Sequence, residues 1–294
     1  MLSSKTSSIP ISSPELFDHI LYAHRCRRYK EAEDFLARLA MDSLADRLSF
    51  IKRRFPRVLS LGAGCLDFHE NLKRDGHGDV HLSHLSVIPG DDLMHLVGGE
   101  EAFASQDLIL SILNLQWAND LPGLLWQIKH MLKPDGLFIG SFLGGDTLKE
   151  LKFAFMQAEL ELFGGASARV VPMSDLYTAS QLLMRADFKL PVADRDVVTV
   201  EYPNLAKLMA DLRRMGLTNI MKQRYPFFSS RRFFQRVEDI YRENFCSPDN
   251  FLQATFEFIY ITGWSYHENQ QKALKPGSAQ VSLIEVIGQD LPTE

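Results

Sequence analysis

The stretch that most constrains the fold is residues 57–64, Arg-Val-Leu-Ser-Leu-Gly-Ala-Gly. A compact apolar run of strand length leads there into Gly62 and Gly64. Glycine adopts φ values that other residues resist, and it lets the backbone approach a ligand closely. In open α/β sheets, ligands sit just beyond the carboxyl ends of the strands. The stretch therefore predicts a buried strand followed by a ligand-binding loop.

Similar runs recur along the chain and alternate with segments of helical periodicity. The run 107–115 is nearly continuous in apolar residues, as expected for a strand covered on both faces. This alternation predicts an α/β fold, with a parallel sheet and helices on both faces. Strands are predicted at 79–87, 107–115, 137–144, 197–203 and 254–264, and helices at 121–132, 144–163, 173–188, 205–216 and 229–245.

Local signals predict where the helices begin. Pro14 after Ser13 predicts the start of an N-terminal helical region that ends before Pro56. Thr147, with Glu150 three residues later, predicts a capping box for the helix over 144–163. Ser174 is the predicted cap of the helix that follows it.

Composition narrows the class of protein. The chain has 294 residues, of which 46% are hydrophobic, enough for one core with a subsidiary cap. A formal net charge of −5 argues against a general nucleic-acid binder. The three cysteines have no CxxC spacing, and the histidines lack acidic companions at ligand spacing, so no metal is predicted. No apolar stretch reaches 18 residues, so we expect a soluble, intracellular protein.

Four regions are predicted along the chain. Residues 1–13 form a disordered lead-in, and residues 14–56 form an N-terminal helical segment. Residues 57–265 form an α/β domain with cap insertions, and residues 266–294 form a C-terminal tail.

The loop itself excludes two nucleotide-binding classes. A dinucleotide fingerprint needs G-x-G-x-x-G, but the sequence here is Gly62-Ala63-Gly64-Cys65-Leu66-Asp67, which has no third glycine. An NAD-linked oxidoreductase is therefore disfavoured, and no phosphate-binding loop of the G-x-x-x-x-G-K-[ST] type is present.

The order of the motifs resembles a known family. RVLSLGAG (57–64), NLQWANDLPG (114–123), LGGDTLKEL (143–151), YPNLAKLMADLRRMGLTN (202–219) and ITGWSYHENQQKALKPGSA (261–279) carry the resemblance over roughly residues 15–285. They are similar to the Rossmann-like, class I S-adenosylmethionine-dependent methyltransferases. Within that class they resemble malonyl-acyl-carrier-protein methyltransferases and, more closely, the methyltransferase-like assembly factors of respiratory complex I, whose mitochondrial member is an arginine hydroxylase.

The resemblance implies a fold and a set of site residues. It implies a seven-stranded Rossmann-like sheet with N-terminal helices and a helical cap. It implies that Gly62, Ala63, Gly64, His84, Glu101 and Asn114 bind S-adenosylmethionine, with His84 near the ribose and Glu101 near the adenine. Trp117 is the predicted catalytic residue, on the acceptor side of the cofactor, and Arg213 and Arg214 are the predicted substrate-binding residues.

Several of these side chains also have a simpler interpretation. Glu101 fits a solvated loop before the strand at 107–115 as well as an adenine contact. Trp117 fits a core aromatic as well as a pocket wall, and Arg213 and Arg214 fit an exposed basic helix face. Asn119 and Asp120 are interpreted as caps of the following helix. The stretch 224–234, RYPFFSSRRFF, fits either a buried cap helix or a surface that docks on a protein or membrane.

The sequence also departs from the family pattern. Ser60 stands where the first strand of the family usually ends in an acid, Leu66 stands where a third glycine often follows, and the acid that usually contacts the ribose is missing near His84. Losing two charge-assisted hydrogen bonds weakens binding on the order of 100-fold or more. Weak or lost cofactor binding is therefore part of the second hypothesis.

Two functional hypotheses follow. The first is an S-adenosylmethionine-dependent methyltransferase whose acceptor is a small carboxylate, an acyl-carrier-linked group or a protein. The second is a complex I assembly factor-like protein that acts by binding or as an arginine hydroxylase. The expected partners are an acyl carrier protein or a respiratory complex I subunit, with peripheral membrane contact open and no nucleic acid. The expected location is the bacterial cytoplasm or the mitochondrial matrix.

Overall fold

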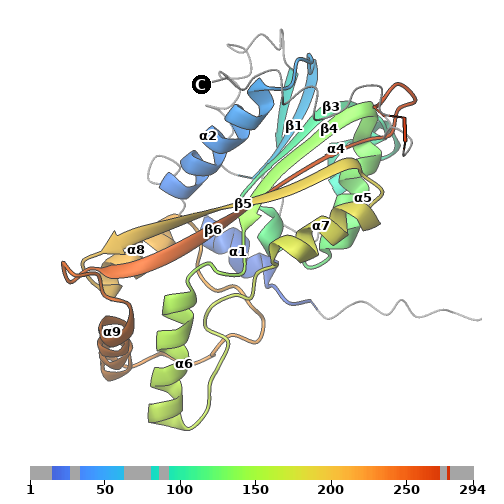
Figure 1. Ribbon diagram of the computed structural model, residues 1–294. Helices are drawn as coiled ribbons and strands as arrows, with labels where there is room; N and C mark the ends of the chain where they lie inside the picture. The colour runs from blue at the N-terminus through green and yellow to red at the C-terminus, as the bar shows by residue number, and fades with distance from the viewer. Residues whose placement is uncertain (1–14, 27–33, 63–80, 86–92, 272–276, 279–294) are drawn as a thin grey trace, which may run out of the picture.

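The computed structural model describes residues 15–26, 34–62, 81–85, 93–271 and 277–278. Its centre is a mixed sheet of six strands in the order β2-β1-β3-β4-β6-β5 (Figure 1). The α/β class and the Rossmann-like architecture predicted from the sequence are confirmed. The strands are β1 (Arg57–Gly62), β2 (His81–Leu85), β3 (Gln106–Ile112), β4 (Leu132–Leu143), β5 (Lys189–Tyr202) and β6 (Leu252–Trp264).

Two details of the predicted sheet are wrong. The pairs β1–β2, β1–β3 and β3–β4 are parallel, but β6 runs antiparallel to both of its neighbours. The expected seven strands are six in the described part of the chain. A further parallel strand needs a crossover of about a dozen residues. The described part of the short segment between β2 and β3 is helical instead, with α4 (Leu93–Val97) and the 3-10 helix η2 (Gly99–Ala102).

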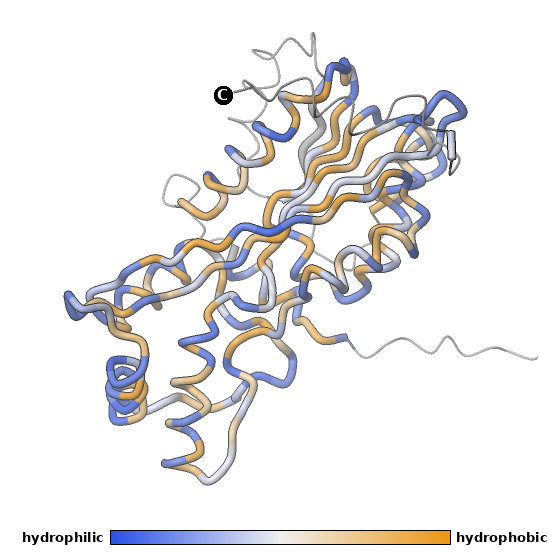
Figure 2. Tube along the Cα trace, viewed as in Figure 1, coloured by the Kyte–Doolittle hydropathy of each residue, from blue (hydrophilic) through white to orange (hydrophobic). Residues whose placement is uncertain are grey.

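Helices cover both faces of the sheet (Figure 1). On one face lies α2 (Phe35–Ser49), and on the other lie α4, α5 (Leu121–Met131) and α7 (Leu176–Arg185). Successive side chains of a strand point to opposite faces, so Leu108 and Leu110 join one apolar cluster and Ile109 joins the other. This double coverage explains why the sheet strands are continuous hydrophobic runs in the sequence (Figure 2).

The two C-terminal strands extend beyond the sheet as an arm. The pairing of β4 with β6 ends at Leu143 and Phe258, whereas β5 and β6 remain paired as far as Tyr202 and Leu252. The helices α6 (Lys149–Phe163), α8 (Leu205–Arg214) and α9 (Arg231–Phe245) gather around this arm (Figure 1). The arm therefore carries the predicted helical cap past the carboxyl ends of the parallel strands.

The predicted capping box at Thr147 and Glu150 is wrong. Leu148 precedes α6 with φ 57°, and no side chain caps the helix. The Thr147 hydroxyl donates to the carbonyl oxygen of Glu257 at 3.2 Å, and the Glu150 carboxylate accepts from the Thr255 amide at 3.1 Å. Both side chains are buried against β6, so tertiary hydrogen bonds replace the local motif.

Two other helix starts also differ from the prediction. Residues 13–14 lie outside the described residues, and α1 (His19–Cys26) begins later, where Asp18 accepts a hydrogen bond from the Leu21 amide at 2.9 Å. The cap of α7 is Asp175 and not Ser174, since its carboxylate accepts from the Thr178 amide at 2.7 Å.

Candidate functional site

Gly62 ends β1 in a conformation that requires glycine. Its φ is 102°, and a Cβ atom there would lie 2.4 Å from the carbonyl oxygen of Ile112 and 3.1 Å from the Cβ of Asn114. Asn114 follows β3 and is 3% exposed, and its side chain does not cap the short helix η3 (Leu115–Trp117) that it precedes. The structure thus brings Gly62 and Asn114 together at the carboxyl edge of the sheet.

The other predicted cofactor residues are not gathered at this point. Ala63 and Gly64 lie outside the described residues. His84 is paired by its backbone with Ser60 in the neighbouring strand, and its side chain lies outside the described part of the molecule. Glu101 is exposed in η2, which precedes β3 and so lies towards the opposite edge of the sheet from Gly62. The roles of these residues stay predictions.

Trp117 is a core residue that also forms part of a cavity wall. It is 2% exposed, and the rings of Phe17 and Tyr22 lie 5.9 and 5.7 Å from its ring. Asn119 holds this packing in place, because its Oδ1 accepts from the Phe17 amide at 2.8 Å and its Nδ2 donates to the Phe17 carbonyl at 3.2 Å. Trp117 is therefore both the core aromatic and the pocket wall that the sequence left as alternatives.

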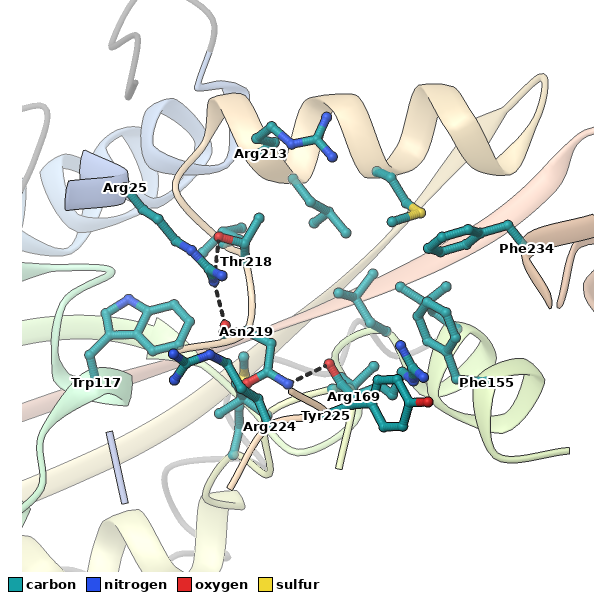
Figure 3. A pocket seen from close by; sticks show the side chains of 18 residues that line it. Arg25, Trp117, Phe155, Arg169, Arg213, Thr218, Asn219, Arg224, Tyr225 and Phe234 are labelled. Carbon is teal, nitrogen blue, oxygen red and sulfur yellow. Dashed lines mark hydrogen bonds between the residues drawn. The ribbon is translucent and has the colours of Figure 1, made fainter. Parts of the chain in front are cut away.

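The cavity beside Trp117 has a volume of about 260 Å³. It lies beyond the ends of β3 and β4, between α1, α6, α8 and the segment that follows α8 (Figure 3). Most of its wall is apolar, which suits an aliphatic or aromatic ligand. The apolar and aromatic lining residues are Trp117, Leu148, Leu151, Phe155, Val170, Val171, Met173, Met209, Leu212, Leu217, Tyr225 and Phe234.

Four arginines interrupt this apolar lining: Arg25, Arg169, Arg213 and Arg224. Arg25 donates to the Thr218 hydroxyl at 3.0 Å and to the Asn219 carbonyl oxygen, and Arg224 forms an ion pair with Asp18 at 3.3 Å. Arg213 lies on α8 at the edge of the cavity and is exposed (Figure 3). Among the described residues that line the cavity, none is an aspartate, a glutamate or a histidine. Arg169 and Arg224 are paired with Glu159 and Asp18, which lie outside the lining, so the charged groups that face the cavity itself favour an anionic ligand.

Relatives of the chain carry two different activities in their names. NDUFAF5, a mitochondrial arginine-hydroxylase of Danio rerio, is 34% identical over 264 residues, which cover 86% of this chain and 82% of that protein. A malonyl-[acyl-carrier protein] O-methyltransferase of Xylella fastidiosa is 37% identical over 242 residues, 76% of this chain and 78% of that protein. The chain belongs to the family of these relatives, the class I S-adenosylmethionine-dependent methyltransferases.

Other comparisons are less direct. No family model matches the chain. The solved structure of a Burkholderia thailandensis N1-methyltransferase, with S-adenosylhomocysteine bound, aligns with 88% of this chain and 93% of its own at 14% identity and a TM-score of 0.43. The family assignment rests on the sequence relatives alone.

In this methyltransferase-family protein, the two predicted substrate-binding arginines lie in different surroundings. Arg213 lines the cavity, whereas Arg214 does not and lies 3.7 Å from the Asp211 carboxylate on the same helix. Asp120 caps α5 as interpreted from the sequence, accepting from the Gly123 amide at 2.9 Å. Asn119 does not cap that helix. It accepts a hydrogen bond from the amide of Phe17, whose ring packs against Trp117.

The ambiguous stretch 224–234 combines features of both interpretations. Its C-terminal part begins α9, which buries Phe233 against the stacked ring of Phe155, as a cap helix does. Phe227 and Phe228 precede that helix and remain largely exposed. Arg224, at the start of the stretch, contributes to the cavity instead of the surface.

Sequence analysis missed three of the four cavity arginines. Arg25 stands in a cluster with Arg27 and Arg28, which is typical of a solvated face, and the last two lie outside the described residues. Arg169 lies in a stretch of small and apolar residues (164–172) without helical or strand periodicity, so no local signal marks it. In the described part of the chain, no group of histidine, cysteine and acidic residues could hold a metal ion, and no helix is long and apolar enough to cross a membrane.

Proposed function

We propose that this protein is an S-adenosylmethionine-dependent methyltransferase whose acceptor is a carboxylate on an apolar body. The observation that supports this most strongly is the cavity beside Trp117, which combines an aliphatic and aromatic wall with four arginines. An anionic acceptor is stabilised by those guanidinium groups, and its apolar part is buried by the wall. The malonyl-[acyl-carrier protein] O-methyltransferase relatives also have a carboxylate-type acceptor in their name.

The residues at the carboxyl edge fit a nucleoside cofactor. Gly62 allows a close backbone approach at the end of β1, and Asn114 offers a buried side-chain amide that does not cap the adjacent helix. In the proposed site these two residues hold S-adenosylmethionine, together with the loop after Gly62. When bound, the cofactor supplies a methyl group on a sulfonium.

The remaining residues bind the acceptor and exclude water. A carboxylate is already a nucleophile at neutral pH, so the site needs no general base, in agreement with the absence of acids and histidines among the described lining residues. Arg213 binds the acceptor carboxylate, and Trp117 closes the wall against solvent. Most of the rate enhancement then comes from positioning the reacting groups.

Titration calorimetry tests the cofactor, and a methyl-transfer assay tests the acceptor. We expect saturable, micromolar binding of S-adenosylmethionine and of S-adenosylhomocysteine. With malonyl-acyl carrier protein as acceptor, Arg213→Gln raises KM by roughly 10-fold or more, the loss expected for a hydrogen bond to a charged group. Arg185→Gln, an exposed arginine on α7 away from the cavity, is the control and leaves KM unchanged. No binding heat at millimolar cofactor contradicts the proposal.

A second candidate function is that of the NDUFAF5 relatives, as an arginine hydroxylase or as a complex I assembly factor that binds a subunit without methylating it. Ser60 supports it, because this buried residue of β1 replaces the acid that the family usually carries there. The cavity argues against an arginine substrate, since four arginines already line it and would repel a further guanidinium. A pull-down that retains a respiratory complex I subunit and no acyl carrier protein favours the second candidate. Cytoplasmic or mitochondrial location stays a prediction.

A further inference from the structure

Arg169 has one donor group that the protein itself does not use. Its Nε donates to the Glu159 carboxylate and its Nη1 to the Ser229 hydroxyl, both at 2.7 Å. Its Nη2 is buried and has no hydrogen-bond partner among the described residues. A buried donor on a charged group that lacks a partner is costly, so such groups are rare without a reason.

The guanidinium of Arg169 is held in a fixed orientation. Glu159 is 2% exposed, and its carboxylate also accepts from the amide and the hydroxyl of Ser167, both at 2.6 Å. The rings of Tyr225 and Phe233 lie 4.3 and 4.5 Å from the guanidinium carbon. A donor with little freedom to turn towards another acceptor is preorganised for a ligand.

Arg169 and Trp117 lie at opposite ends of the cavity (Figure 3). Arg169 lies beside Phe155 and Tyr225, while Arg213 lies on the α8 side (Figure 3). Aliphatic side chains, including Leu148, Leu151 and Met173, line the cavity between the charged groups. Arg25 and Arg224 lie on the Trp117 side of the cavity, so Arg169 is a cationic position separated from them across an apolar lining (Figure 3).

We propose that Arg169 is a specificity-determining residue that binds a second carboxylate of the acceptor through Nη2. The acceptor class is then an aliphatic dicarboxylate, with its reacting carboxylate towards Trp117 and Arg213 and its other carboxylate at Arg169. This inference rests on the proposed function for the reaction but not for binding, because the apolar cavity and Arg169 act on the ligand without the cofactor.

Calorimetry without cofactor tests the inference. Adipate, suberate and sebacate are each compared with the monocarboxylate of equal length: hexanoate, octanoate and decanoate. We expect one or more diacids to bind roughly 10- to 100-fold more tightly than the matched monocarboxylate, the range for one hydrogen bond between charged groups. The series of three lengths is needed because the span between the two carboxylates must match the cavity.

Variants assign that preference to Arg169. In Arg169→Lys, which keeps a charge beside Glu159 but has no fork of donors, the ratio of affinities falls to near one. Arg169→Gln gives the same result, and Arg185→Gln keeps the wild-type ratio. Thermal unfolding checks that each variant is folded, and the lysine variant remains informative if the glutamine variant is unstable.

The two proposals fail separately. If the wild-type protein shows no preference for any diacid, or if both Arg169 variants keep the preference, the inference is overturned whatever the catalytic result. If the diacids bind through Arg169 but neither they nor malonyl-acyl carrier protein is methylated when S-adenosylmethionine is added, the inference stands and the proposed methyltransferase function is contradicted.

Discussion

The buried pair of Glu159 and Arg169 gives the sharpest stability prediction. The side chain of Glu159 is 2% exposed and that of Arg169 is 12% exposed, and 2.7 Å separates their paired atoms. Removing one partner of a buried ion pair costs about 3–5 kcal/mol, because the other charge is left uncompensated. Native proteins unfold at a cost of about 5–15 kcal/mol, so Glu159→Gln should remove a large share of the stability.

The matched control lies on the same helix. Glu161 pairs with Arg236 at 2.7 Å, but its side chain is 44% exposed. Exposed ion pairs contribute about 0–1 kcal/mol, so Glu161→Gln should change the free energy of unfolding by no more than that. Urea unfolding followed by circular dichroism measures both variants. Equal losses in the two variants, or a loss below about 1 kcal/mol for Glu159→Gln, would refute the argument from burial.

The pH dependence of the same pair has a definite sign. Burial raises the pKa of Glu159, but hydrogen bonds from Ser167 and Arg169 outweigh it and hold the pKa below its ordinary value. A carboxyl whose pKa is lowered on folding contributes its full stability above its unfolded pKa, about 4.3, and loses it as the pH falls through the folded pKa. The difference between wild type and Glu159→Gln should therefore be constant from about pH 6 to 8 and shrink below about pH 4.

Three further substitutions are tested by the same unfolding assay, and a fourth is tested by amide exchange. Gly62→Ala should destabilise by more than about 2 kcal/mol, since it combines a positive φ with a backbone clash, whereas Gly165→Ala, with nothing within 4 Å, should stay within about 0.5 kcal/mol. Burial raises the pKa of Tyr202 to about 12, and its hydroxyl has no partner among the described residues, so Tyr202→Phe should be neutral or stabilising. The hydroxyl of Tyr241 donates to a backbone carbonyl at 2.7 Å, so Tyr241→Phe should cost about 1 kcal/mol. Asn119→Ala should release residues 15–26, measured as faster amide exchange there, and unchanged exchange would contradict the role of Asn119 as their anchor.

The sheet could be predicted from the sequence because its strands are buried on both faces. Such strands are continuous hydrophobic runs, and β1 and β3 were found at nearly their observed positions, whereas β4 begins at Leu132 and not at residue 137. The first half of β5 was missed, because it lies at the edge of the sheet and exposes residues such as Leu190 and Val192. Its sequence, with Pro191 and Asp194, has the weak pattern of an edge strand.

Local motifs failed where tertiary contacts compete with them. Thr147 and Glu150 have the spacing of a capping box, yet the side chain of each forms hydrogen bonds with β6. The pattern records only that two polar side chains lie three residues apart. Which backbone groups they satisfy depends on a strand more than one hundred positions later, and no window of sequence contains that information.

The acceptor site could not be assembled from the sequence for a geometric reason. Its arginines come from α1, from the segment after α6, from α8 and from the segment before α9. Each one alone is indistinguishable from a solvated charge. Three of them converge because β5 and β6 extend beyond β4 and carry the cap over the end of the sheet, and Arg25 joins them from α1. The sheet therefore forms the scaffold and the edge at which we propose that the cofactor binds, while the arm carries most of the arginines of the cavity. It follows that exchange of arm and cap residues should alter the acceptor while leaving cofactor binding intact, which is the independence on which the tests of Arg169 and Arg213 depend.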